Sequence, residues 1–253
     1  MKISIITVCY NSEKHIKSAI ESVINQTYKD IEYIIVDGAS KDATIDIVKS
    51  YGSKITKFVS EPDKGIYDAM NKGFKMATGD YLAVINSDDF YMNNEVIASV
   101  VDELIVKKTD SLFADLIYVE ENNANKQVRY WKSNEFVKDS FKKGWHPAHP
   151  TFFVKNEIYK KYGYFDLSFK LAADFELMLR FLEKYQISSC YLPKPIIKMR
   201  LGGATNKNFK NIYNQNIECY KAFKVNKLSV SFLYPIYRLL PKLIQFFKKD
   251  NVN

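Results

Sequence analysis

Carboxylate and amide side chains gather in two short segments that follow apolar runs. Asn86-Ser87-Asp88-Asp89 comes directly after Tyr81–Ile85, and Asp37 follows Ile31–Val36. Mg²⁺ and Mn²⁺ prefer oxygen ligands and commonly bridge to substrate phosphates. Asn, Ser and Asp are also typical of a turn that caps the following helix. The residue types therefore leave a metal site and a capping turn open as alternatives for the first segment.

Asp37 opens the run Asp37-Gly38-Ala39-Ser40-Lys41-Asp42. A carboxylate here can accept the imide N–H of a pyrimidine base, while Gly38 lets a ligand approach the backbone closely. The alternative is again a turn, in which Ser40 or Asp42 starts the next helix.

Apolar and helix-periodic segments alternate over the first part of the chain. The predicted strands are Ile3–Cys9, Ile31–Val36, Ile55–Ser60 and Tyr81–Ile85, and the predicted helices are Ser12–Gln26, Asp42–Tyr51 and Ile66–Ala77. Asn11 or Ser12 is the predicted cap of the first helix. This alternation predicts an α/β fold with a parallel, doubly wound sheet, which binds ligands at the carboxyl ends of its strands. No dinucleotide fingerprint or P-loop is present, so those two phosphate-binding classes lose their main support.

The second part of the chain is less regular. The predicted elements are a helix Val96–Val106, a hairpin of Ser111–Val119 and Gln127–Trp131, a strand Thr151–Val154, helices Asn156–Tyr162 and Ala173–Tyr185, a strand Tyr191–Arg200, and helices Asn206–Phe223 and Ser229–Phe247. No repeat or linker divides these segments.

Composition excludes several classes of protein. With 47% hydrophobic and 15% aromatic residues, and only nine Gly and seven Pro, the chain is not disordered. Its three cysteines are well separated, which excludes a disulfide framework and predicts a reducing compartment. The N-terminal apolar run is too short for a signal peptide, and we expect no membrane-spanning helix.

The net charge of +8 is concentrated in residues 221–253, which hold seven basic residues and one acid.

The strand-end motifs together resemble the family 2 glycosyltransferases, which are inverting enzymes with nucleotide-sugar donors. The resemblance rests on Thr7-Val8-Cys9-Tyr10-Asn11, Val36–Thr44 and Asn86–Asp89, in this order. Ser60–Gly73 (SEPDKGIYDAMNKG) resembles a subgroup that acts in bacterial surface-polysaccharide assembly. The resemblance implies a GT-A fold, which is Rossmann-like with a mostly parallel central sheet flanked by helices.

The resemblance also implies roles for individual residues. Thr7 and Asp37 would contact the base and ribose of a uridine-type nucleotide, and Asn11 would join them in binding substrate. Asp88 would coordinate Mg²⁺ or Mn²⁺ on the diphosphate, with Asp89 nearer the sugar.

Further donor contacts would come from Lys64 and Asp68, which would touch ribose, phosphate or base. Two positions depart from the family pattern: Gly38 stands where many members have a second acid, and Asn86 where many have Asp. Because a neutral amide is a weaker ligand, Asp88 would carry more of the metal binding.

An inverting transfer needs a general base that takes the proton of the acceptor hydroxyl. Asp174 matches the family's late acidic position, at a helix start where the helix dipole favours a carboxylate. Glu176 is a competing candidate, and Asp174 as a plain N-terminal helix acid is the structural alternative.

Three residues of the later loops are candidates for the substrate pocket. His146 and His149 form H-x-x-H, but without a further close ligand, and with Pro147 between them, they do not predict zinc. His149 is a predicted pocket residue, and Trp145 a predicted sugar-stacking one. Arg200, before Gly202 and Gly203, would face a phosphate if the loop closes, or is an exposed arginine before a turn.

The function expected from the resemblance is transfer from a UDP-sugar to a glycan or polyprenyl-diphosphate-linked acceptor, in capsule, O-antigen or exopolysaccharide synthesis. We expect a GT-A domain over residues 1–205, with a nucleotide-binding half (1–90) and an acceptor half (91–205). A helical tail (206–253) is expected to follow this domain.

Leu228–Lys249 is basic, aromatic and apolar, which predicts binding to an anionic membrane. Packing on the domain or on a partner subunit is the alternative, so an oligomer is possible.

The protein is therefore expected in the cytoplasm, peripheral on the inner face of the cell membrane. A nucleotidyltransferase on a related sheet is disfavoured because Cys9–Ser12 lacks the glycine- and basic-rich loop of that class. A noncatalytic nucleic-acid-binding protein is disfavoured because no nucleic-acid fingerprint accompanies the charge, so no nucleic-acid partner is expected.

Overall fold

The computed structural model describes residues 1–202, 209–236 and 238. Its central feature is one sheet of nine strands in the order β3-β2-β1-β4-β8-β6-β9-β5, with β7 paired to β6. The strands are β1 (Ile3–Cys9), β2 (Ile31–Asp37), β3 (Lys57–Ser60), β4 (Tyr81–Asn86), β5 (Phe90–Tyr91), β6 (Ser111–Val119), β7 (Gln127–Trp131), β8 (Phe153–Lys155) and β9 (Ser189–Arg200). The predicted α/β class is confirmed.

Strand direction differs between the two parts of the sheet. The strands β3, β2, β1 and β4 are parallel, as predicted. Strand β8 is antiparallel to both of its neighbours, β4 and β6, while β9 runs parallel to β6. The predicted hairpin of β6 and β7 is confirmed. The parallel part is the one whose strand ends carry the predicted donor residues.

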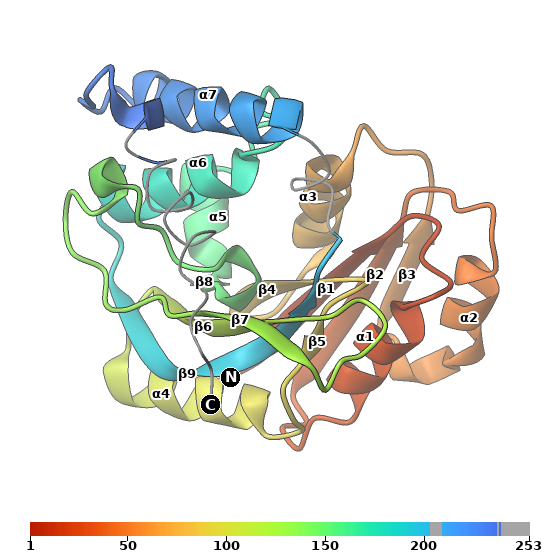
Figure 1. The fold of residues 1–253 in the computed structure, drawn as a ribbon. Coiled ribbons are helices and arrows are strands. Elements are labelled where there is room, and N and C mark those ends of the chain that lie inside the picture. The colour runs from red at the N-terminus through yellow and green to blue at the C-terminus, as the bar shows by residue number, and fades with distance from the viewer. Residues whose placement is uncertain (203–208, 237, 239–253) are drawn as a thin grey trace.

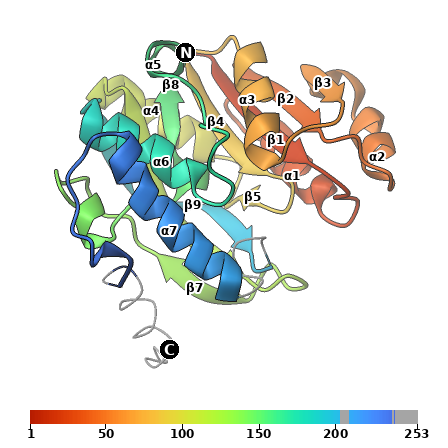
Figure 2. The same cartoon turned by 90° about the horizontal axis from the view of Figure 1, so that it is seen from above.

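Helices cover both faces of the sheet (Figures 1 and 2). One face carries α3 (Ile66–Met76), α5 (Asn156–Tyr162), α6 (Ala173–Leu179) and α7 (Phe209–Val225). The other carries α1 (Ile16–Ile24), α2 (Thr44–Ser50) and α4 (Val96–Lys107). Short 3-10 turns lie at Gly52–Lys54, Phe141–Lys143 and His149–Thr151. Seen from above, α7 crosses over α6 (Figure 2).

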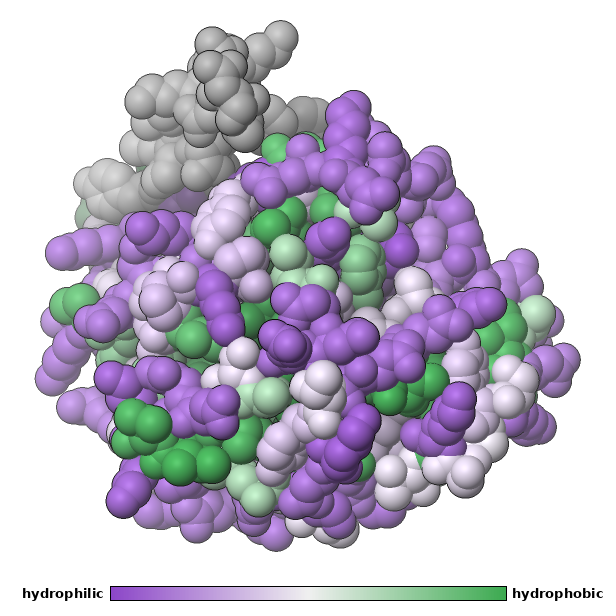
Figure 3. All heavy atoms as spheres, turned by 90° about the horizontal axis from the view of Figure 1, so that it is seen from below, coloured by the Kyte–Doolittle hydropathy of each residue, from purple (hydrophilic) through white to green (hydrophobic). Residues whose placement is uncertain are grey.

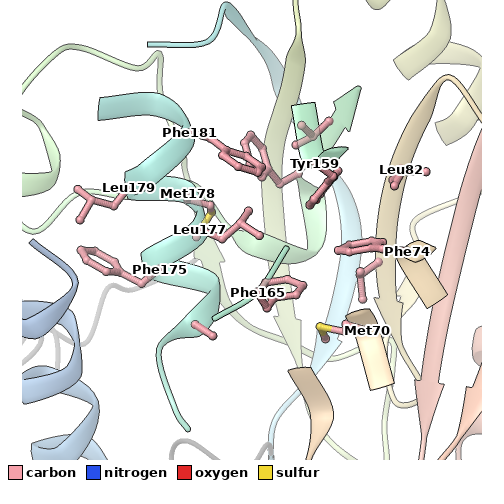
Figure 4. Packing of buried hydrophobic residues seen from close by; sticks show 14 of the residues in the cluster. Met70, Phe74, Leu82, Tyr159, Phe165, Phe175, Leu177, Met178, Leu179 and Phe181 are labelled. Atoms are coloured by element: carbon pink, nitrogen blue, oxygen red, sulfur yellow. The ribbon is translucent and has the colours of Figure 1, made fainter. Parts of the chain in front are cut away.

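Aromatic side chains fill the space between α3 and α6 (Figure 4). The ring of Phe74 on α3 lies 4.5 Å from that of Tyr159 on α5 and 5.7 Å from that of Phe165, and Tyr159 contacts Phe181. Such ring pairs add to the stabilisation from burial. This packing determines how α3 and α6 sit relative to each other.

Three sequence predictions need correction. The first helix begins at Ile16, with His15 at its N-cap position and no side-chain cap, so the predicted cap by Asn11 or Ser12 is wrong. The strand predicted at Thr151–Val154 is instead a 3-10 turn followed by β8. The helix predicted over Ala173–Tyr185 becomes a π-helical turn at Arg180–Lys184.

The C-terminal part is described only in places. Helix α7 agrees with the predicted Asn206–Phe223 helix, whereas most of the predicted Ser229–Phe247 helix, the domain boundary at residue 205, and Gly203 lie outside the described residues. No helix of the described part of the chain is long and apolar enough to cross a membrane.

The three cysteines are all buried. On the face seen in Figure 3, polar residues predominate and hydrophobic ones show in separate patches.

Candidate functional site

The carboxyl ends of β1, β2 and β4 meet at one edge of the sheet. Strand pairing places Cys9 beside Asp37 and Val8 beside Asn86. The backbone N–H of Gly38 donates to the carbonyl of Cys9 at 2.9 Å. The expected meeting of the strand-end motifs is therefore present.

Hydrogen bonds join the loops that follow these strands. Asn11 has φ +47°; its N–H donates to Ser40 Oγ at 2.8 Å, and its Oδ1 accepts the N–H of Lys41 at 2.9 Å. The hydroxyls of Ser12 and Ser87 lie 2.8 Å apart. Side chains predicted to cap a helix thus connect the β1 loop to the loops after β2 and β4.

Asp37 and Thr7 lie beneath this edge, and both are fully buried. Asp37 accepts the N–H of Ser40 at 2.9 Å and the hydroxyl of Ser60 at 2.6 Å, as well as the hydroxyl of Ser40. The Thr7 hydroxyl pairs with that of Tyr33 at 3.0 Å. These side chains shape the turns around the edge, and their contact with a nucleotide stays a prediction.

Gly38 lies in a narrow space between two side chains that the sequence analysis did not select. A Cβ at this position would lie 2.6 Å from a carboxylate oxygen of Asp63 and 3.3 Å from the ring of Tyr10. Tyr10 is 62% exposed although it follows a buried strand directly. An exposed aromatic residue at a polar strand end is a signal that could have been used, because aromatic rings are suited to stacking on bases.

The segment after β4 contains the predicted metal-binding residues. Asp88 is half-buried, whereas Asp89 is fully buried and accepts a hydrogen bond from Asn86 Nδ2 at 3.0 Å. Burial, followed by the charge of Asp88, raises the pKa of Asp89 well above its ordinary value. Asp88 is thus the carboxylate of this segment that reaches the surface.

The segment offers oxygen ligands that suit a divalent cation. The Oδ1 atoms of Asn86 and Asp89 are buried without a hydrogen-bond partner within the described residues. An unpartnered buried acceptor is costly, and a cation would satisfy it. No group of three or more His, Cys, Asp or Glu side chains that could hold a metal exists in the described ranges. The set fits Mg²⁺ or Mn²⁺, which commonly takes few protein ligands and completes its shell with phosphate oxygens and water.

Arg200 supports the same segment from β9. Its Nη1 donates to the carbonyl of Asp88 at 2.6 Å, and its guanidinium lies 4.6 Å from the centre of the Phe90 ring. Burial lowers the pKa of Arg200, while the charges of Asp88 and Asp89 oppose that effect. Arg200 therefore holds the backbone beside Asp88, and its contact with a phosphate stays a prediction.

Asp174 lies in the first turn of α6, outside the segments that follow β1, β2 and β4. Its Oδ1 accepts the hydroxyl of Tyr67, on α3, at 3.1 Å. Burial lowers the pKa of His149, and the negative charge of Asp174 opposes that shift. The structure thus brings Asp174 and His149 together, and adds Tyr67, which the sequence analysis quoted in a motif but did not select.

The pKa of Tyr118 depends on aspartates from two parts of the site. Burial raises the pKa of Tyr118 on β6 to about 12; Arg129 opposes this, and the charges of Asp89 and Asp174 add to it. Asp89 of the β4 segment and Asp174 of α6 are therefore both near enough to Tyr118 to raise the pKa of its hydroxyl.

Trp145, one of the remaining predicted residues, packs inward. The indole N–H of Trp145 donates to the carbonyl of Ser133, and its ring contacts Phe113, Phe136 and Phe141. Trp145 thus packs against aromatic side chains, and its stacking on a sugar stays a prediction.

Lys64 and Asp68 form the turn into α3, at the edge of a cavity of about 50 Å³ that Tyr67 and Lys170 also line. Asp68 accepts the backbone N–H of Lys64 at 3.0 Å, and the Lys64 side chain is exposed. Their contact with the donor stays a prediction.

Comparison with known proteins identifies similar sequences. The model of "Glycosyl transferase family 2" matches residues 4–164. An uncharacterized glycosyltransferase of Rickettsia typhi is 30% identical, over 98% of this chain and 80% of its own length. A PGL/p-HBAD biosynthesis glycosyltransferase of Mycobacterium tuberculosis is 25% identical, over 80% of this chain and 78% of its own length.

Solved structures share the fold. TarS 1–349 of S. aureus in complex with UDP has a TM-score of 0.69 at 20% identity, and the match covers 100% of this chain and 74% of TarS 1–349. This chain spans 44% of the longer TarS structure. Mannosyltransferase PcManGT of Pyrobaculum calidifontis, in complex with GDP-Man and Mn²⁺, has a TM-score of 0.64 at 16% identity, with coverage of 93% and 68%. These likenesses confirm the GT-A fold expected from the sequence.

Proposed function

Because this chain belongs to glycosyl transferase family 2, we propose that it transfers a sugar from a UDP-sugar to an acceptor hydroxyl with inversion at the anomeric carbon. The observation that carries the proposal is the edge of the sheet where β1, β2 and β4 end, because strand pairing places Asp37 and Asn86 there, with Asp88 two residues further on. This edge offers ligands for a metal on the donor diphosphate, and Asp174, held by Tyr67, offers a carboxylate for the acceptor.

Support for a uridine donor comes from Tyr10, whose exposed ring lies beside Gly38. The exposed Tyr10 ring beside a residue without a Cβ offers a flat base a stacking surface next to the backbone. TarS 1–349 has been solved with UDP and with UDP-GlcNAc, whereas PcManGT was solved with GDP-Man. UDP is therefore the proposed nucleotide, and GDP is the natural control.

The chain's own residues would prepare the donor. Asp88, with the amide oxygen of Asn86, would hold Mn²⁺ or Mg²⁺, which when bound offsets the charge of the departing diphosphate. Arg200 holds the Asp88 backbone in place through its bond to the carbonyl oxygen. The interlocked loops of Asn11, Ser40 and Lys41 preserve this edge before any ligand arrives.

Asp174 is the proposed general base. It would take the proton of the acceptor hydroxyl while the new glycosidic bond forms on the face opposite the leaving diphosphate, which accounts for inversion. Tyr67 orients the carboxylate through its hydroxyl. Glu176, the competing candidate, is buried and forms an ion pair with Arg180 at 3.0 Å, which favours Asp174.

The proposed acceptor is a glycan or polyprenyl-diphosphate-linked sugar in cell-surface polysaccharide synthesis. The resemblance of Ser60–Gly73 supports this class, as does the similarity to proteins named for PGL/p-HBAD biosynthesis. Such an acceptor would be reached by a cytoplasmic enzyme that lies on the anionic inner face of the cell membrane through residues 206–253.

Calorimetric titration tests the proposal. UDP should bind the wild-type chain more tightly with Mn²⁺ than without it, and GDP should bind weakly in both conditions. Asp88→Ala should remove the Mn²⁺ dependence, which we expect to be about 10-fold or more, because the metal then loses its carboxylate ligand. Equal UDP affinity of wild type and Asp88→Ala in Mn²⁺ would contradict the assignment of Asp88.

The next measurement is turnover, which is followed as the release of UDP. A panel of three donors is compared, namely UDP-glucose, UDP-galactose and UDP-N-acetylglucosamine. Asp174→Asn should lower the rate by at least about 100-fold while leaving UDP affinity unchanged, because the base acts on the acceptor side. Turnover of none of the donors by the wild type would overturn the proposed function itself.

A further inference from the structure

Glu218, on α7, binds three consecutive backbone N–H groups of another part of the chain. Its carboxylate accepts the N–H of Lys170 at 3.0 Å, of Leu171 at 2.8 Å and of Ala172 at 2.9 Å. Gln215, one turn earlier on α7, donates to the carbonyl of Leu171 at 3.4 Å. A carboxylate that gathers several backbone N–H groups in this way holds a concave turn of main chain in one conformation.

The segment that Glu218 holds leads directly into the helix of the proposed base. Ala172 is the N-cap residue of α6, and Asp174 lies in the first turn of that helix. The carbonyl of Ala172 accepts the N–H of Glu176 at 2.9 Å, so the path of the N-cap backbone sets where the first turn begins. A shift of residues 170–172 would therefore move the Asp174 carboxylate with them.

We propose that Glu218 is a positioning residue for transfer, which fixes the place of Asp174 through residues 170–172. This inference rests on the proposed role of Asp174 as the base. The hydrogen bonds of Glu218 go to residues 170–172, and its charge also raises the pKa of Tyr67, the partner of Asp174, so its effect lies on the acceptor side. The physical reason for a large effect is that catalysis by a base depends steeply on its distance from the proton it removes.

A second contact near the same helices provides a control, because its loss should lower the stability of the fold without moving residues 170–172. Asn226, directly after the last residue of α7, donates from Nδ2 to Glu176 Oε1 at 2.8 Å, and both residues are buried. Asn226→Ala removes a buried bond to α6, but it leaves the bonds to Lys170, Leu171 and Ala172 in place. It is therefore the matched control for a loss of stability.

The experiment compares Glu218→Ala, Glu218→Gln and Asn226→Ala in the full chain, with the UDP-sugar of the panel that turns over fastest. We expect kcat to fall by about 100-fold in Glu218→Ala, with the KM for the donor and the affinity for UDP unchanged. Glu218→Gln keeps one acceptor oxygen, so it should recover part of the lost kcat. Asn226→Ala should lower the melting temperature but keep kcat.

A double variant shows whether Glu218 acts through Asp174. If it does, adding Glu218→Ala to Asp174→Asn should lower the residual rate no further, because the displaced group is already inactive. Multiplicative losses, or a wild-type kcat in Glu218→Ala, would overturn the inference. A wild-type kcat in Asp174→Asn would instead overturn the proposed base, so the two failures are told apart. Hydrogen exchange of residues 170–172 should quicken in Glu218→Ala, and unchanged protection would also contradict the inference.

Discussion

The Tyr67 hydroxyl is placed to orient the carboxylate of the proposed base. It donates to Asp174 at 3.1 Å, and burial together with the charge of Asp174 raises the pKa of Tyr67 well above its ordinary value, so it remains a donor at neutral pH. Its hydrogen bond therefore holds the carboxylate of Asp174 in one orientation. Burial also lowers the pKa of His149, which lies near Asp174, so the imidazole is neutral at neutral pH.

Tyr67→Phe should lower kcat by about 10-fold, because Asp174 then loses the hydrogen bond that orients its carboxylate toward the acceptor. The ring keeps its place against Phe165, 5.3 Å away, so the fold should be retained. Steady-state rates at saturating donor measure kcat, with Tyr185→Phe as the control. A wild-type kcat in Tyr67→Phe would show that the hydroxyl does not act on the base.

At the scale of elements, Glu32 joins the parallel strands at the edge opposite the candidate site. It is buried on β2 and accepts hydrogen bonds from Ser4 on β1 at 2.5 Å, from Lys57 on β3 at 2.8 Å, and from Thr78. Burial alone would raise the pKa of Glu32, but these hydrogen bonds outweigh it and lower the pKa to about 2.

Because the folded value lies below the ordinary 4.5, Glu32 stabilises the fold above pH 4.5, and this contribution is lost as the pH falls toward 2. Glu32→Gln should lower the free energy of unfolding at pH 7 by about 2 kcal/mol, discounted because Lys57 is partly exposed. Urea titrations at pH 7 and pH 3 measure the difference, which should shrink at pH 3. Glu157→Gln, at an exposed site, is the control, and an equal loss in both variants would contradict this account.

Strands and helices that follow from a local sequence pattern could be predicted from the sequence. Those that depend on contacts between distant residues could not. Strands β1, β2 and β4 follow from apolar runs bounded by turns, and their parallel pairing brings Asp37 and Asn86 to one edge. In contrast, β5 is two residues long and pairs with β9 more than one hundred residues later, which no local pattern indicates. The Tyr67–Asp174 pair is 107 residues apart in sequence, so neither residue carries a local sign of the other.

At the scale of the whole molecule, charge and apolar surface coincide on α7 and the residues after it. Tyr213 is 63% exposed and Phe232 79%, and Ile217 and Ile236 are also exposed. Lysines accompany them on the exposed surface, namely Lys210, Lys221, Lys224 and Lys227. Glu218 faces inward to the backbone, so the outer surface is basic as well as apolar, which is typical of segments that lie on anionic lipid.

The full chain should therefore sediment with phosphatidylglycerol vesicles and much less with phosphatidylcholine vesicles, and added salt should weaken the binding. Tyr213→Ser with Phe232→Ser should reduce vesicle binding by about 10-fold, because both side chains lose their apolar contact. Val106→Ser with Val128→Ser, at exposed sites on α4 and β7, is the matched control. Equal sedimentation with both lipids would contradict membrane binding and favour packing against a partner subunit.

The burial of all three thiols has a practical consequence for spectroscopy. Burial raises the pKa of Cys9 and of Cys190, and the thiolate is the form that reacts with alkylating reagents. The native cysteines should therefore stay unlabelled in the folded protein. Tyr213→Cys would introduce a single reactive thiol on the outer side of α7, so a fluorophore attached there could report its depth in a bilayer without a cysteine-free background.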